Sequence, residues 1–229
     1  MTDNELDKTD FFYLNPNPEI VVQMIRRESE EGYFDAFQSV GPTVALCSGI
    51  FRQFPERVAE WMDQLEDLPE KTRHGLNLAL WYSDVDEGRA CLQKALLKSA
   101  NEDEINQLKS LVGIAPPKIV ELPIDFPPSV LDMCWGLFMA TGDEACVKRV
   151  IEVANFKEMT CDQCDEDHEC DLCVVFQQIR RAACWSLESL AFQHKRVLEI
   201  CKAEFKKNPS DKVLTYVVKS ASKRLSKTN

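Results

Sequence analysis

Apolar residues recur every three or four positions along most of the chain, which is the period of a helix with one buried face. The first such stripe follows the Asn15–Pro18 turn and runs from Ile20 to Ile25. Between residues 70 and 82 the apolar positions cover nearly every side of the predicted helix. A helix of that kind belongs in the centre of a core, so we expect this segment to be deeply buried.

Prolines and capping residues indicate where the predicted helices begin. Helices are expected to start near Pro42 and again at Pro55, because proline fits the first turn of a helix. Gly142 is expected to end a helix. The expected N-caps, whose side chains can accept a hydrogen bond from a free backbone N–H, are Asp84 or Asp86, Asn101, Ser129 and Asp143.

A proline-rich stretch divides the predicted helices into two sets. Residues 113–128 hold five prolines interleaved with apolar residues. We therefore predict a linker inside or between two helical halves, which packs against them as it crosses from one to the other. The predicted organisation is an acidic N-terminus at 1–14, an N-terminal helical half at 15–112, the linker at 113–128, a C-terminal helical half at 129–223 that includes a Cys-rich loop at 155–173, and a basic tail at 224–229.

The composition also favours helices over sheets. The 229 residues include only 8 glycines, and long runs of β-branched residues are missing. Sheet proteins use glycine in tight turns and β-branched residues on pleated faces. We therefore predict an all-α fold of stacked helical hairpins, an α-solenoid of about ten or eleven helices with a Cys-rich loop insertion.

A weak internal repeat supports the stacked arrangement. Cys134-Trp135 recurs as Cys184-Trp185, each within a predicted helix. Each pair is followed by a similar hexad in the next helix: Lys148-Arg149-Val150-Ile151-Glu152-Val153 and Lys195-Arg196-Val197-Leu198-Glu199-Ile200. Hairpins that reuse a buried aromatic residue are typical of stacked repeats. The pattern resembles HEAT or tetratricopeptide repeats in architecture, although the consensus residues of those families are not matched.

The strongest chemical signal is a pair of CxxC motifs in the Cys-rich loop. Cys161 and Cys164 form the first motif, and Cys170 and Cys173 form the second after a spacer of five residues. Two such pairs can supply four thiolates to a tetrahedral zinc ion. Because the spacer is short, His168 could replace one cysteine as a ligand. The sequence therefore predicts a structural zinc site that orders this loop.

The charge around the loop bears on the choice between metal binding and thiol chemistry. Seven acidic residues and only one basic residue, Lys157, lie between residues 157 and 171. Negative neighbours raise the pKa of a thiol and disfavour the reactive thiolate, whereas a divalent cation offsets their repulsion. A redox sensor or thiol enzyme that uses the two CxxC motifs is the alternative hypothesis.

No other pattern points to catalysis. The chain contains no GxSxG, GxxxxGK[ST], GxGxxG or HExxH motif. Of the other histidines, His74 and His194 are expected to be exposed or to cap helices. The four tryptophans and the six remaining cysteines fall on apolar faces and are expected to pack in the core; these cysteines are Cys47, Cys91, Cys134, Cys146, Cys184 and Cys201.

Charge and the absence of targeting signals narrow the function classes. The net charge is −11, which speaks against a nucleic-acid binder, although residues 202–229 carry a local charge of +6. The first ten residues are acidic and do not resemble a signal peptide, and no apolar run is long enough to span a membrane. We therefore predict a cytoplasmic scaffold or adaptor that binds a protein partner and engages neither nucleic acid nor membrane.

Overall fold

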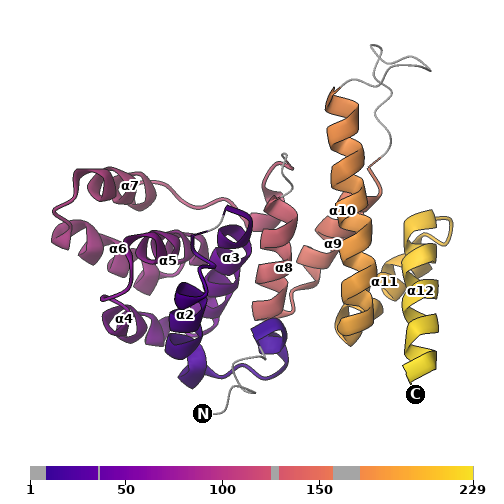
Figure 1. The fold of residues 1–229 in the computed structure, drawn as a ribbon, viewed down its shortest axis with the longest axis horizontal. Coiled ribbons are helices and arrows are strands. Elements are labelled where there is room, and N and C mark those ends of the chain that lie inside the picture. Colours follow the sequence, from indigo (N-terminus) through magenta and orange to yellow (C-terminus); the bar gives the residue numbers. More distant parts are fainter. Residues whose placement is uncertain (1–8, 36, 125–128, 157–170, 229) are drawn as a thin grey trace. The chain divides into compact units, whose positions relative to one another are not determined.

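Every regular element in the described part of the chain is a helix, which confirms the predicted all-α class (Figure 1). The computed structural model describes residues 9–35, 37–124, 129–156 and 171–228. None of the helices found there combines the length and the apolar character that crossing a membrane requires. The 3-10 helices are η1 (Thr9–Leu14), η2 (Pro18–Ile20) and η3 (Ile119–Glu121). The α-helices are α2 (Val21–Glu30), α3 (Phe37–Gln53), α4 (Pro55–Gln64), α5 (Glu70–Ser83), α6 (Asp86–Lys98), α7 (Glu102–Val112), α8 (Ser129–Thr141), α9 (Glu144–Ala154), α10 (Asp171–Gln193), α11 (Lys195–Lys207) and α12 (Lys212–Thr228).

The chain divides into two compact units. Unit 1 comprises residues 1–123 together with 132–142, and unit 2 comprises residues 124–131 together with 143–229. The last ten residues of α8 thus belong to unit 1, and its first three belong to unit 2.

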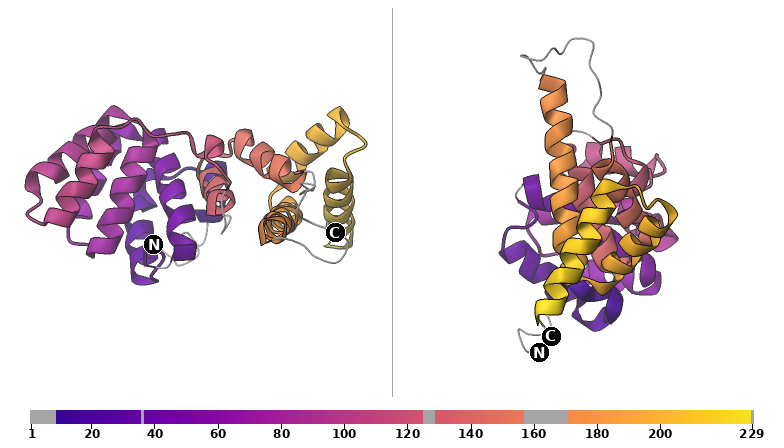
Figure 2. Two further views of the ribbon diagram at one scale, coloured as in Figure 1. Left: turned by 90° about the horizontal axis from the view of Figure 1, so that it is seen from above. Right: turned by 90° about the vertical axis from the view of Figure 1, so that its right-hand side faces the viewer.

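Unit 1 packs its helices around a core of aromatic and aliphatic side chains. Contacts pair α3 with α5, α4 with α6, and α6 with α7 (Figure 2). Trp61 of α4 is 1% exposed, and its ring centroid lies 6.1 Å from that of Phe51 in α3 and 6.2 Å from that of Phe54. Leu76, Ala79 and Leu80 of α5 are buried as expected, whereas Glu70, Lys71 and His74 at the start of the helix are exposed.

Several helix ends are set by local signals in the sequence. Pro55 is the first residue of α4, and Asn101 caps α7 by accepting hydrogen bonds from the N–H groups of Asp103 and Glu104. The expectation that Asp84 or Asp86 caps α6 was wrong, because the N-cap is Val85. Asp84 instead ends α5 in the left-handed region with φ 53°.

The expectation that a helix starts near Pro42 was wrong, because Pro42 lies inside α3. The helix begins five residues earlier, at Phe37. The carbonyl oxygen of Pro42 approaches Gly136 of α8 so closely that a Cβ on Gly136 would lie 2.1 Å from it. A second close contact follows along the same pair of helices, where a Cβ on Gly49 would lie 2.6 Å from that of Ala140.

The described part of the proline-rich linker packs against unit 1. Ile119 in η3 is 3% exposed. The indole Nε1 of Trp81 donates a hydrogen bond to the carbonyl oxygen of Ile114 over 2.6 Å. This end of the linker is therefore packed into unit 1.

Unit 2 is organised around α10, the 23-residue helix that contacts α9, α11 and α12. Asp143 caps α9 as expected, with its side chain accepting from the N–H of Ala145. At the other end of α9, the amide of Asn155 donates to Asp211, which also accepts from the N–H of Leu214 at the start of α12. Polar contacts thus tie the end of α9 to the start of α12.

We expect Gly136→Ala to lower the free energy of unfolding by about 1–3 kcal/mol, because the added methyl group would force the backbones of α3 and α8 apart. Urea denaturation followed by circular dichroism would measure the change. Gly113→Ala is the matched control, since its Cβ would lie 3.6 Å from the carbonyl oxygen of Lys109. Equal stability of the two variants would contradict the inferred contact.

Candidate functional site

The predicted zinc site falls almost entirely outside the described residues. Cys161, Cys164, Cys170 and the substitute ligand His168 all lie there. Cys173 is described: it is the third residue of α10 and is half-buried. Within the described ranges, no group of three or more His, Cys, Asp or Glu residues could hold a metal ion. The zinc site therefore stays a prediction from the sequence.

The other six cysteines lie within the described helices. Of the six that were expected in the core, Cys91 and Cys184 are half-buried, and the remaining four are buried. Burial raises the pKa of the Cys201 thiol to about 12 and raises the pKa of Cys47, Cys91 and Cys184 as well. A protonated thiol is a poor nucleophile, so these positions do not favour thiol catalysis.

The two described histidines, His74 and His194, differ in their burial. His74 is exposed, and its Nε2 lies 2.8 Å from the side-chain nitrogen of Gln107. His194 occupies the N-cap position of α11 but makes no side-chain capping bond, and it is 1% exposed. Its position at the helix start matches the expectation, whereas its burial was not foreseen.

An exposed tryptophan marks a surface between α10 and α12 of unit 2. The side chain of Trp185 is 71% exposed, and Tyr216 of α12 is 58% exposed. A hollow of about 430 Å³ lies between the two helices. Its lining defines what we call the Trp185 surface: Gln177, Arg180, Arg181, Cys184, Trp185, Glu188 and Tyr216.

The exposure of Trp185 contradicts the expectation that all four tryptophans pack in the core. Trp135 is 7% exposed and packs edge-on against Phe138, with ring centroids 6.1 Å apart. The two Cys-Trp pairs therefore occupy unrelated environments, and the inference that their hairpins are equivalent was wrong. The hexads do share a burial pattern, since the third, fourth and sixth residues of each are buried.

The position of Trp185 follows from the buried stripe of α10. Ile179, Ala183, Leu187 and Ala191 are buried at intervals of four residues. At about 100° per residue, Trp185 lies about 200° away from Ala183 and so faces away from this stripe. That spacing was a signal in the sequence that could have identified Trp185 as a surface residue.

Glu188 joins α10 to α12 beside Trp185. Its carboxylate accepts hydrogen bonds from Ser220 Oγ over 2.6 Å and from Tyr216 Oη over 3.0 Å, and it pairs with Arg224 over 3.1 Å. The bond from Ser220, with further contributions from Tyr216 and Arg224, lowers the pKa of Glu188. The Glu188 carboxylate likewise raises the pKa of the Tyr216 hydroxyl. The carboxylate that lines the Trp185 surface is thus already bound within unit 2.

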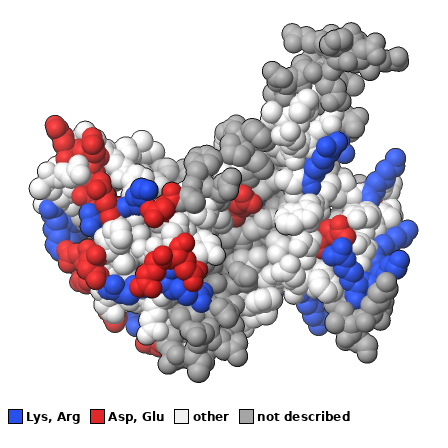
Figure 3. All heavy atoms as spheres, viewed as in Figure 1, with Lys and Arg blue, Asp and Glu red and all other residues white. Residues whose placement is uncertain are grey.

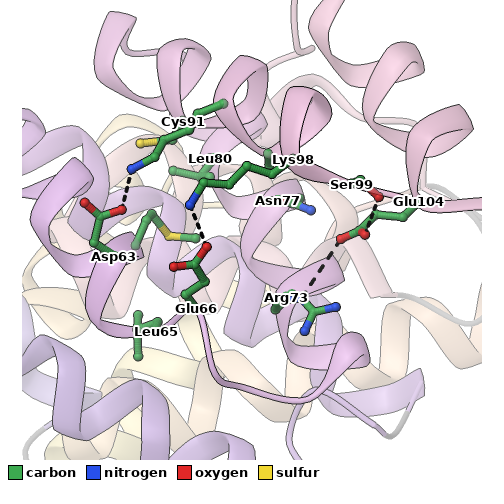
Figure 4. A pocket seen from close by; sticks show the side chains of 13 residues that line it. Asp63, Leu65, Glu66, Arg73, Asn77, Leu80, Cys91, Lys98, Ser99 and Glu104 are labelled. Atoms are coloured by element: carbon green, nitrogen blue, oxygen red, sulfur yellow. Dashed lines mark hydrogen bonds and ion pairs between the residues drawn. The ribbon is translucent and has the colours of Figure 1, made fainter. Parts of the chain in front are cut away.

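A second hollow of about 300 Å³ lies in unit 1 among α4, α5, α6 and α7 (Figure 4). Its rim carries two ion pairs between helices: Lys94 with Asp63 at 2.5 Å and Lys98 with Glu66 at 2.6 Å. The hydrogen bond from Lys94 lowers the pKa of Asp63. Beneath the rim lies Asn77, which is 4% exposed.

The charged side chains on the far wall of the unit 1 hollow are also paired with protein groups. Glu104 accepts a hydrogen bond from Ser99 Oγ over 2.6 Å and lies 4.0 Å from Arg73 Nε. Arg73 in turn donates to the carbonyl oxygen of Leu68. Sequence reasoning missed this site, because nothing in the sequence distinguishes Asn77 from the other polar residues of α5, such as Thr72 and Arg73.

Comparisons with protein-family models, with curated proteins and with solved structures find no match to this chain.

The Glu188 contacts generate a prediction about pH. Because the pKa of Glu188 is lower in the folded chain, its ionised form stabilises the fold above the unfolded-state pKa of about 4.3. This stabilisation is lost as the pH falls through the folded-state pKa. Glu188→Gln should therefore lower the melting temperature at pH 7, and the difference from the wild type should shrink as the pH approaches 3.

Thermal unfolding followed by circular dichroism over this pH range would measure the difference. Glu199→Gln, at an exposed position of α11, is the control. A difference between Glu188→Gln and the wild type that stays constant over the range would contradict the assigned role of the carboxylate.

Proposed function

We propose that this protein is a non-enzymatic helical scaffold that binds a protein partner through the Trp185 surface. The observation that carries the proposal is the 71% exposure of Trp185 beside Tyr216 and Arg181. Tryptophan, tyrosine and arginine are the residue types that most often dominate the binding energy of protein interfaces. An exposed tryptophan in a hollow is therefore well suited to anchor a partner.

The charge of this region indicates an acidic partner segment. Residues 171–229 contain twelve Lys and Arg residues and five Asp and Glu residues, a net charge of +7. On the face drawn in Figure 3, the coloured side chains of unit 2 are nearly all basic. Glu188 is bound to Ser220, Tyr216 and Arg224, so it adds little repulsion. Complementary charge speeds association and selects among partners.

The arrangement of the helices supports a scaffold of stacked hairpins. Consecutive helices contact each other in both units, as α5 with α6, α6 with α7, α10 with α11 and α11 with α12. Such stacks present extended surfaces and need no catalytic group. The ten cysteines of the chain suit a reducing compartment such as the cytoplasm, where thiols stay free or bind metal.

The Cys-rich loop completes the proposal as a structural zinc site. Cys161, Cys164, Cys170 and Cys173 would supply the four thiolates, or His168 would replace one of them. The support is the paired CxxC spacing and the acidic residues around it, which attract a cation. A redox role for the same cysteines is the competing function.

Trp185 should contact the protein partner directly, and truncation of its side chain should weaken partner binding without unfolding the chain. A photoreactive side chain at position 185 of the full chain should crosslink one protein in the native cell, and the same group at Leu97 should not. Leu97 is the control because it lies in unit 1 and is 87% exposed. The purified partner should then bind Trp185→Ala at least about 30-fold more weakly than the wild type, equivalent to about 2 kcal/mol.

A charge variant tests the acidic character of the partner. Arg181→Glu should weaken binding more at low salt than at high salt, whereas Lys206→Glu, outside the Trp185 surface, should have little effect. Crosslinking of position 185 to nucleic acid or to a second copy of this chain would contradict the proposal. So would a partner that binds Trp185→Ala as tightly as the wild type.

The zinc site has its own test. Protein purified under reducing conditions should contain about one zinc ion per chain, and its four loop thiols should resist alkylation until a chelator is added. Cys173→Ser should lower the zinc content, and Cys91→Ser should leave it unchanged. A metal-free protein with a reversible disulfide among the loop cysteines would instead support the redox function.

A further inference from the structure

The unit 1 hollow has the properties of a ligand site that is separate from the Trp185 surface. Its volume of about 300 Å³ lies at the lower end of the range of small-molecule pockets. Leu65 and Leu80 form an apolar floor, each 1% exposed, and Met62 and Ala95 add apolar walls. The hollow is therefore suited to a small ligand with an apolar surface.

One polar group in this floor has no protein partner. Asn77 is 4% exposed, and its carboxamide makes no hydrogen bond to any residue that the structure describes. Figure 4 shows the side chain of Asn77 within the hollow, between Leu80 and the Ser99–Glu104 pair. Buried side-chain amides normally have hydrogen-bond partners, so an open amide in a pocket indicates a group that a ligand satisfies.

The charges of the hollow are paired with one another. Lys94 binds Asp63, Lys98 binds Glu66, and Glu104 is held by Ser99 and Arg73. A charged ligand would have to break one of these pairs or enter without a counter-ion. The balance of charge therefore favours a neutral ligand.

We propose that this hollow binds an uncharged small molecule with an apolar body and an amide-type pair of one donor and one acceptor. The carboxamide of Asn77 presents an acceptor oxygen and donor N–H groups side by side, and an amide or lactam presents the matching pair. Leu65 and Leu80 contact the apolar body, and the ion pairs of the rim enclose it. The site does not depend on the function proposed for unit 2.

Benzamide is the probe, because it combines an apolar ring with a neutral amide. Titrated into the full-length ¹⁵N-labelled chain, it should shift the side-chain amide signals of Asn77 and the backbone signal of Ala95. Methyl benzoate, which has acceptors only, and benzoate, which is charged, should bind at least about fivefold more weakly. This comparison requires no variant, so it does not depend on the folding of a mutant.

Two variants and a control locate the binding. Asn77→Leu keeps the branched shape of the side chain but removes both polar atoms, and should weaken benzamide binding at least about fivefold. Ala95→Leu should weaken it by filling the hollow. Asn106→Leu, at an exposed position of α7, should leave binding unchanged. The proposal is overturned if the three probes bind alike, if the shifts lie outside the hollow, or if Asn77→Leu binds benzamide as the wild type does.

Discussion

Where α3 crosses α8, the contact in unit 1 is made by backbone as much as by side chains. Gly136 leaves room for the carbonyl of Pro42, and Gly49 leaves room for Ala140 and Leu137. The amide of Gln53 then reaches across to the carbonyl oxygen of Ala140 over 2.9 Å. The core depends on this approach, because α3 also packs against α5 and carries Phe51 onto Trp61. Glycine is scarce in this chain, and here it serves close helix packing.

The features that sequence reasoning predicted well are those set by neighbours along the chain. Asn101 and Asp143 cap helices because a short polar side chain reaches N–H groups two or three residues ahead. Gly142 ends α8 with φ 65°, which few other residues adopt. Pro42 was misjudged because its tolerance inside α3 accompanies a contact with Gly136, nearly a hundred residues away.

The two candidate sites were harder to predict because burial depends on distant neighbours. Trp135 and Trp185 both follow a cysteine, yet only Trp135 is covered by its own unit. Asn77 is buried because four helices surround it, and the sequence around Asn77 does not show this arrangement. The two sites also differ in chemistry: the Trp185 surface offers an open aromatic ring and basic charge, whereas the hollow of unit 1 offers a single amide among paired ions.

The exposure of Trp185 gives the chain an optical property that separates its two units. Trp61 and Trp135 are shielded from water inside unit 1, and the Trp81 indole is held by the Ile114 carbonyl. Trp185 is the most exposed of the four tryptophans. Indole in solvent emits at longer wavelength and is accessible to soluble quenchers. The long-wavelength edge of the emission spectrum is therefore weighted towards Trp185 of unit 2, and a change confined to that edge distinguishes an event at α10 from one among α4 to α7.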